Sequence, residues 1–164
     1  MRNLDHGVII SIDIGTKGAV VAIKRPDIIL NIYDMPTTPD GAKGRAAVNG
    51  PLLADIIYQT HASRAFVEFV GPRPTDGTTG AFGFGRSRGL VEGVLAAAGI
   101  PLVWITPPTW KRCFNIPPGR ENKDVARARA IAHWPGQASL FSRKCDIDRA
   151  EAALIGLCGI KREG

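Results

Sequence analysis

Two acidic residues stand alone within apolar, strand-like segments, and their carboxylates are the first candidates for functional side chains. Asp13 lies in residues 8–23, where one apolar run, a glycine turn and a second apolar run follow one another. Glu68 interrupts the apolar run 64–70 in the same way. A carboxylate among isoleucines and valines is costly to remove from water unless a positive group meets it. Each acid therefore needs a basic neighbour or a bound cation.

A third group of acids lies near the end of the chain, at Asp146, Asp148 and Glu151. A helix is expected to begin at residues 146–148 because Asp is a favourable N-cap, and Asp148 and Glu151 then share a helix face. Acids in a first helical turn are ordinarily explained by capping and the helix dipole. Glu151, however, is surrounded in the sequence by alanine and leucine, where a plain surface acid is less expected. Asp146 lies just before Asp148 and could reach the same site as Asp148 and Glu151.

These acids indicate a site for a hard divalent cation. Carboxylates from distant segments, without His or Cys, suit Mg²⁺ or Mn²⁺ rather than zinc. Two such ions about 4 Å apart can bind both sides of a scissile phosphate, so we expect two ions per site. Without metal the carboxylates would repel one another and several would take up protons. The alternative for Glu68 is a neutral or salt-bridged core residue.

The pattern along the chain predicts an α/β fold with a mixed five-stranded sheet, its first three strands antiparallel, flanked by helices. Residues 8–23 and 27–34 supply those three strands, and 35–50 is expected to be a loop. The strand–helix–strand step 64–105 implies parallel additions to the sheet. The expected helices are 51–62, 81–99, 106–112, 123–134 and a last one running to residue 160.

The bulk composition limits the class of protein. A chain of 164 residues, 45% apolar and 22% charged, is long enough for a single domain, 1–164, with its own core. It contains no apolar run of membrane-spanning length, and the first residues do not resemble a signal peptide. Its three cysteines lack metal-ligand spacing, which suits free thiols in a reducing cytoplasm.

The net charge of +6 favours a polyanionic partner. Much of the positive charge falls in the second half of the chain, at Arg86, Arg88, Lys111, Arg112, Arg120, Lys123, Arg127, Arg129, Arg143 and Lys144. Lys123 stands at the start of an expected helix, where a phosphate would also find free backbone N–H groups. The string G-F-G-R is no dinucleotide fingerprint, and we expect no organic cofactor.

The strings SIDIGTKGAV, FVEFV, FGFGRSRGLVEGVLAAAGIP, TPPTWKR and DRAEAALIG occur in this order along nearly the whole chain. Together they resemble the RNase H-like nuclease superfamily, and specifically RuvC-type Holliday-junction resolvases of the kind found in phages and prophages. The resemblance implies an RNase H-like fold. It also implies a homodimer that binds four-way DNA junctions and nicks two opposing strands symmetrically, using divalent metal.

The resemblance also implies roles for the acids. By position, Asp13 and Glu68 match the first two catalytic acids, and Asp148 and Glu151 match the last pair. Many phage members place the third acid slightly earlier, so Asp146 competes with Asp148. The fourth acid is Glu where the cellular enzymes usually have Asp, but its longer side chain still reaches a metal.

Basic residues and one aromatic residue complete the implied site. Lys111 and Lys123 fall where the family keeps basic residues near the scissile phosphate, and Lys123 is therefore also a candidate catalytic residue. The loop after Glu68 would lie at the junction, with Phe69 either wedged against bases or packed in the core. The full set of expected DNA-binding residues is Lys111, Arg112, Lys123, Arg86, Arg88, Phe69 and Arg73.

Three other hypotheses compete with a junction resolvase. An actin-like kinase or ATPase fragment shares the D-x-G-T hairpin, but it would need a second phosphate-binding hairpin, an adenosine motif and a longer chain. A non-catalytic branched-DNA-binding module of the same fold stays open as an alternative, as does an RNase H that acts on RNA–DNA hybrids. A metal-dependent cleavage assay on each substrate separates these two from a junction resolvase.

Overall fold

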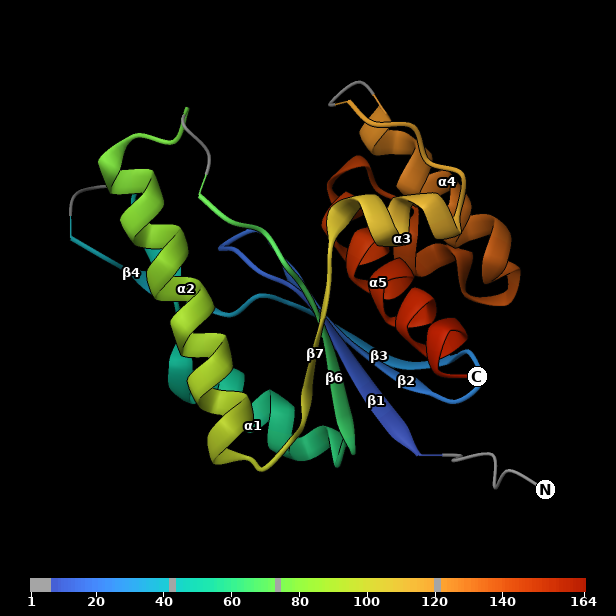
Figure 1. Ribbon diagram of the computed structural model, residues 1–164, viewed down its shortest axis with the longest axis horizontal. Coiled ribbons are helices and arrows are strands. Elements are labelled where there is room, and N and C mark those ends of the chain that lie inside the picture. The colour runs from blue at the N-terminus through green and yellow to red at the C-terminus, as the bar shows by residue number, and fades with distance from the viewer. Residues whose placement is uncertain (1–6, 42–43, 73–74, 120–121) are drawn as a thin grey trace.

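The computed structural model describes residues 7–41, 44–72, 75–119 and 122–164 (Figure 1). Its strands are β1 (Val8–Asp13), β2 (Ala19–Lys24), β3 (Ile28–Asp34), β4 (Thr37–Pro39), β5 (Ala46–Val48), β6 (Arg64–Glu68) and β7 (Leu102–Ile105). Its α-helices are α1 (Gly50–Thr60), α2 (Thr78–Ala97), α3 (Pro107–Cys113), α4 (Lys123–His133) and α5 (Ile147–Glu163). Two 3-10 helices, η2 (Pro135–Phe141) and η3 (Lys144–Asp146), connect α4 to α5.

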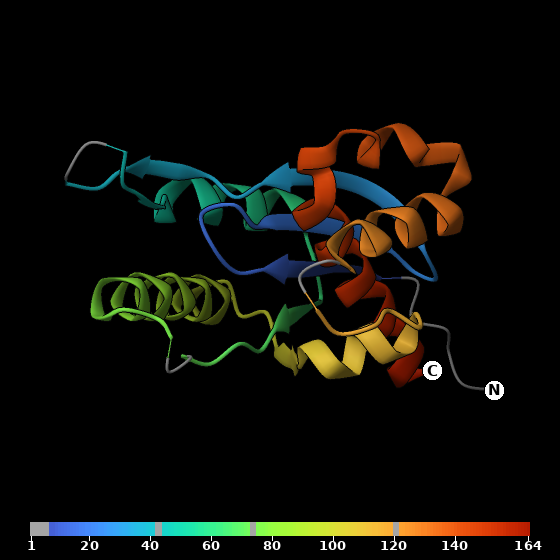
Figure 2. The same ribbon diagram turned by 90° about the horizontal axis from the view of Figure 1, so that it is seen from above.

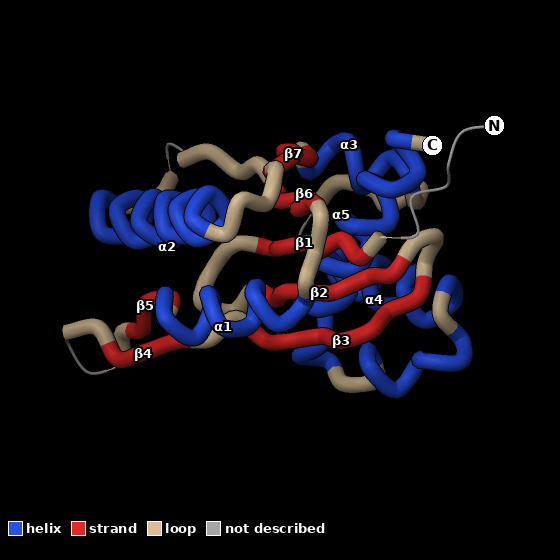
Figure 3. Tube along the Cα trace, turned by 90° about the horizontal axis from the view of Figure 1, so that it is seen from below, coloured by secondary structure: helices blue, strands red, loops and turns tan. Residues whose placement is uncertain are grey.

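The main sheet has the strand order β3-β2-β1-β6-β7 (Figure 3). The pairs β1–β2 and β2–β3 are antiparallel, whereas β1–β6 and β6–β7 are parallel. The predicted mixed five-stranded sheet is therefore confirmed. Because β1 and β6 are parallel neighbours, their carboxyl ends lie side by side, and these ends carry Asp13 and Glu68.

Helices cover both faces of this sheet. Figure 1 shows α1 and α2 on one side and α3, α4 and α5 on the other. Alternate residues of β1 serve the two layers: Ile9 packs in the core under α5, and Ile10 packs in the core under α1 and α2. None of the helices in the described ranges is long and apolar enough to cross a membrane.

The turn between β1 and β2 fixes the place where β1 ends. Gly15 has a φ of +143°, which strains residues with a side chain. A Cβ atom at Gly18 would overlap the backbone carbonyl of Asp13. Both glycines are therefore needed for the chain to turn immediately after Asp13.

Two glycines of α5 let this helix lie directly on the sheet. A Cβ at Gly156 would collide with the side chain of Ser11, and one at Gly159 would collide with the ring of Phe66. The helix is buried along most of its length, from Ala150 to Gly159. This close contact brings the first turns of α5 to the carboxyl end of β1.

The segment 35–50, predicted to be a loop, instead contains the short hairpin β4–β5. Its strands are only three residues long, too short for a sequence pattern, and Ala47 and Val48 of the hairpin are buried. Helix α2 begins at Thr78, before the predicted residue 81; residues 78–80 are exposed, and no side chain caps this helix start. The hairpin and α2 project together beyond one end of the sheet (Figure 2).

The prediction of free thiols is wrong for two of the three cysteines. Cys113, the last residue of α3, and Cys158 of α5 form a disulfide with a Cα–Cα distance of 6.2 Å. Only Cys145 is free, and it is exposed. The disulfide fixes α3 to the helix that carries Asp148 and Glu151.

Candidate metal centre

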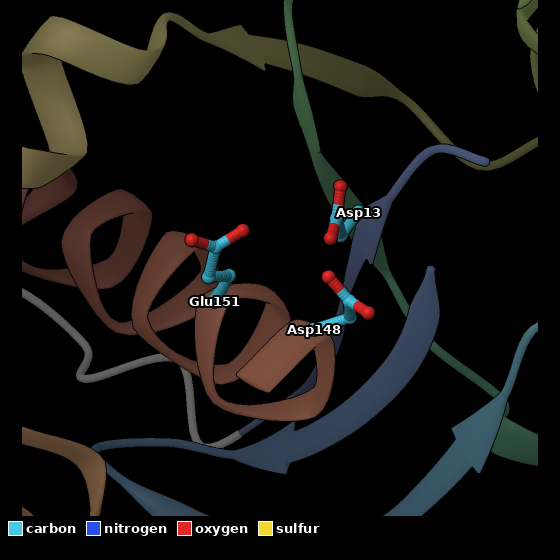
Figure 4. Close-up of side chains that lie close together, drawn as sticks. All are labelled: Asp13, Asp148 and Glu151. Carbon is cyan, nitrogen blue, oxygen red and sulfur yellow. The ribbon is translucent and has the colours of Figure 1, made fainter. Parts of the chain in front are cut away.

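Three carboxylates converge at the carboxyl end of β1. Asp13, Asp148 and Glu151 each offer an oxygen atom, and these atoms all lie within 4.8 Å of one another (Figure 4). Asp13 is buried, with 8% of its surface exposed, and the two residues of α5 are half-buried. Like charges this close raise one another's proton affinity unless a cation balances them.

Local structure accounts for this convergence. The glycine turn ends β1 at Asp13, and α5 begins at Ile147, so Asp148 lies in the first helical turn. Glu151 follows three residues later on the same face of the helix. Figure 4 shows both side chains pointing from α5 toward Asp13.

Glu68 lies beside this group without belonging to it. Ile12 of β1 pairs with Val67 of β6, so Glu68 comes next to Asp13 on the neighbouring strand. Phe66 packs in the core under α5, and Glu68, two residues later, therefore faces the same side of the sheet. The indole Nε1–H of Trp110 donates a hydrogen bond of 2.8 Å to Oε1 of Glu68.

Asp146, the residue that competed with Asp148, occupies a different position. Its carboxylate is 1% exposed and accepts hydrogen bonds from the backbone N–H of Arg143 at 2.8 Å and from the Arg143 guanidinium at 2.7 and 3.0 Å. Burial alone would raise the pKa of Asp146, but these bonds outweigh burial and lower it. Asp146 thus holds η3 and the start of α5 together, and Asp148 is the acid that faces Asp13.

A second ion pair holds α5 against β3. The guanidinium of Arg149 donates two hydrogen bonds of 2.6 Å to the carboxylate of Asp34, the last residue of β3. These bonds lower the pKa of Asp34. The Arg149 guanidinium also lies 3.7 Å from Asp146. Because Arg149 follows Asp148 directly, this pair fixes the helical turn that carries Asp148.

The expected DNA-binding residues of α3 lie directly after Trp110. Lys111 and Arg112 form the basic last turn of this helix, and the Lys111 amino group lies 5.4 Å from the centre of the Trp110 ring. Lys123 is the first residue of α4, but its side chain lies outside what the structure describes. Arg73 also lies outside the described residues.

The other expected DNA contacts have protein partners. Arg86 forms a 2.8 Å ion pair with Asp40, which connects α2 to the β4–β5 hairpin. The guanidinium of Arg88 lies 4.6 Å from the ring centre of Phe69 and 4.5 Å from that of Trp104. Phe69 is 39% exposed, so it is not a core residue.

The carboxylate group fits a hard divalent cation. Its donors are all oxygen atoms, the ligands that Mg²⁺ and Mn²⁺ prefer. Reasoning from the sequence singled out Asp13, Asp148 and Glu151 but missed Trp110 and Arg149 as residues that position the acids. The string TPPTWKR contributes to the resemblance and contains Lys111 and Arg112, but nothing in it reveals that the indole meets Glu68.

Comparison with known proteins gives a likeness in structure only. No protein-family model matches the sequence, and no curated protein matches it. The structure is similar to T. thermophilus RuvC in complex with a Holliday junction substrate, with a TM-score of 0.68 and 19% identity over 97% of each chain. A second Thermus thermophilus RuvC structure gives a TM-score of 0.58 and 14% identity over 95% of each chain.

The yeast mitochondrial Holliday junction resolvase Ydc2 is also similar, with a TM-score of 0.56 and 11% identity over 96% of this chain and 82% of the resolvase. Identities this low establish a shared fold and no more. The likeness that the sequence strings indicate is thus confirmed at the level of the fold.

Proposed function

We propose that this chain is a structure-selective, divalent-metal-dependent endonuclease that resolves four-way DNA junctions by paired symmetric nicks. The observation that carries the proposal is the convergence of Asp13, Asp148 and Glu151 within 4.8 Å at the carboxyl end of β1. The fold shared with RuvC resolvases supports it, because one of those structures holds a Holliday junction substrate.

The residues of the site have distinct tasks in this proposal. Asp13, Asp148 and Glu151 would hold Mg²⁺ or Mn²⁺, and Glu68, next to Asp13 on β6, would supply a further ligand. A pair of such ions, when bound, supplies a hydroxide nucleophile and charge stabilisation at the leaving oxygen. Lys111 and Arg112, after Trp110 on α3, are suited to meet backbone phosphates. Lys123 at the start of α4 has the same proposed task.

The proposed partner is branched DNA, bound by two copies of the chain. A net charge of +6 suits a polyanion. One metal centre cuts one strand, so two symmetric nicks require two centres, which a twofold homodimer supplies. We place this activity in the cytoplasm of a bacterial or phage-infected cell, in one nuclease domain that spans residues 1–164.

Two alternative functions can be tested against this proposal: a non-catalytic DNA-binding module and an RNase H. A non-catalytic DNA-binding module would have no use for three clustered carboxylates, so their presence in one group favours an enzyme. An RNase H would use the same group on RNA–DNA hybrids. Only the preferred substrate distinguishes this enzyme from a resolvase.

The test is cleavage of five labelled substrates of matched sequence in Mg²⁺ and in Mn²⁺: a four-way junction, a flap, a linear duplex, a single strand and an RNA–DNA hybrid. We expect paired nicks at symmetric positions in the junction and little cleavage of the others. Preferential cleavage of the hybrid would replace the proposal with an RNase H. Junction binding without cleavage in either metal would favour the non-catalytic module.

A further inference from the structure

A groove of about 560 Å³ opens beside the carboxylates, between the β1–β2 turn, the end of β3 and the start of α5. Asp148 is part of its wall, so the groove and the metal centre share a side chain. The charged and hydroxyl residues that line it are Thr16, Lys17, Asp34, Arg143, Lys144 and Asp148.

Two acids at this groove, Asp34 and Asp146, are balanced by arginines. Asp34 accepts two hydrogen bonds from Arg149. Asp146, behind the groove, accepts its bonds from Arg143. Even so, 60% of the Arg143 side chain remains exposed. The charge that the groove presents to an incoming anion is therefore positive.

Two lysines supply most of that charge. Lys17 lies in the turn after β1, Lys144 begins η3, and both are exposed. No ion pair within the described ranges involves either one. Elements far apart in the sequence thus bring two available ammonium groups to the rim of one groove, next to a candidate metal ligand.

The groove and the basic last turn of α3 lie at different sides of the metal centre. In Figure 4, α3 lies nearer to Glu151, whereas Asp148 lies in the first turn of α5. Lys111 and Arg112 belong to α3, and Lys17 and Lys144 belong to the groove at Asp148. A phosphodiester strand that crosses the carboxylates would meet cations on both sides of the cut.

We infer that the groove of Lys17, Arg143 and Lys144 binds backbone phosphates of the cleaved strand next to the scissile one. This inference rests on the proposed nuclease function and adds the path of the strand. Ammonium and guanidinium groups neutralise phosphates without reading bases, so the groove fixes the register of the strand in the site and carries no sequence preference.

The first test measures DNA binding in the Asp13→Asn background, so that no cleavage intervenes. The variant Lys17→Ala/Lys144→Ala is compared with Lys24→Ala/Arg162→Ala, which removes the same two charges at exposed positions. Lys24 pairs with Val8, at the opposite end of β1 from Asp13, and Arg162 lies near the C-terminal end of α5. All four residues are exposed, so folding should survive, and thermal unfolding checks this.

Loss of two phosphate contacts predicts roughly tenfold weaker binding at low salt and a salt slope smaller by about 2 for the groove variant. The control variant should keep the slope of the parent. Three results would each overturn the proposed phosphate-binding role of the groove. They are equal salt slopes for the groove variant and its parent, equal losses of DNA affinity in the two variants, or no DNA binding by the parent.

The second test replaces single phosphates of the junction with uncharged methylphosphonates around the mapped nick. Neutral linkages on one side of the nick should weaken binding by the parent but not by the groove variant. The same loss in both proteins would overturn the assignment. If the wild-type chain does not cleave junctions while the groove variant still loses duplex affinity and salt slope, the nuclease proposal fails and the groove stands as a DNA-binding site.

Discussion

The indole Nε1–H of Trp110 donates a 2.8 Å hydrogen bond to Oε1 of Glu68, across the step from α3 to the end of β6. Trp110 is fully buried, and the helix that carries it is joined to α5 through Cys113 and Cys158. One oxygen of Glu68 is therefore held in place by a rigid donor. The carboxylate is kept on the face of the sheet where Asp13 lies.

Removing this donor should weaken metal binding. We expect Trp110→Phe to bind Mn²⁺ about 10–100-fold more weakly, the range found when a group that orients a metal ligand is lost. Titration calorimetry measures the affinity directly, and the metal concentration for half-maximal cleavage should rise in parallel.

Trp134→Phe is the matched control for this prediction. Trp134 is also buried, and its indole donates a 2.6 Å hydrogen bond to the backbone carbonyl of Asp27. Both changes remove an indole from the core, but only one of them touches Glu68. Equal Mn²⁺ affinities of the two variants would show that Trp110 does not position Glu68.

The pair Asp146→Asn and Asp148→Asn distinguishes a structural acid from a metal ligand. Asp146→Asn should lower the free energy of unfolding by about 1–3 kcal/mol, since a buried carboxylate loses its charged hydrogen bonds. Asp148→Asn should change the free energy of unfolding less than Asp146→Asn does, because Asp148 is only half-buried and Asp146 is 1% exposed. Asp148→Asn should weaken Mn²⁺ binding by more than about 100-fold. The reverse pattern would make Asp146 the third acid of the site.

Acid should weaken the attachment of α5 to β3 and η3. Asp34 and Asp146 both have a pKa below the ordinary value of 3.8. A lowered pKa contributes stability that is complete above the unfolded value and is lost as the pH falls through the folded one. Urea unfolding from about pH 7 to about pH 2 should therefore show a smaller loss for Asp146→Asn than for the wild-type protein. Parallel curves would contradict this assignment.

The disulfide between α3 and α5 should stabilise the fold. Cys113 and Cys158 are 45 residues apart, and closing a loop of this size is expected to contribute about 2–4 kcal/mol. Reduction should lower the free energy of unfolding by that amount in the wild-type protein and equally in Cys145→Ser. Non-reducing peptide mapping that finds both thiols free would contradict the pairing.

The sequence indicated candidate site residues where an acid stands among apolar neighbours. Asp13 and Glu68 are isolated acids in apolar strands, and Glu151 lies among alanine and leucine, so each attracted attention without any coordinates. The i,i+3 spacing then placed Asp148 beside Glu151, and the structure brings Asp13, Asp148 and Glu151 together.

The features that could not be predicted depend on contacts between distant segments of the chain or on the orientation of individual side chains. The sequence alone does not distinguish the roles of Asp146 and Asp148, whereas the structure shows Asp146 bound by hydrogen bonds from Arg143. The partners Trp110 and Glu68 are 42 residues apart. The β4–β5 hairpin depends on the burial of Ala47 and Val48, a tertiary contact that overrides weak local preferences.

The most direct test of the central claim is cleavage of an end-labelled four-way junction by the wild-type protein and by Asp13→Asn, each with Mg²⁺ and with EDTA. We predict symmetric nicks in two opposing strands by the wild-type protein in Mg²⁺ alone, and undiminished junction binding without cleavage by Asp13→Asn. Cleavage in EDTA, or wild-type cleavage rates in Asp13→Asn, would contradict a metal centre built on this carboxylate group.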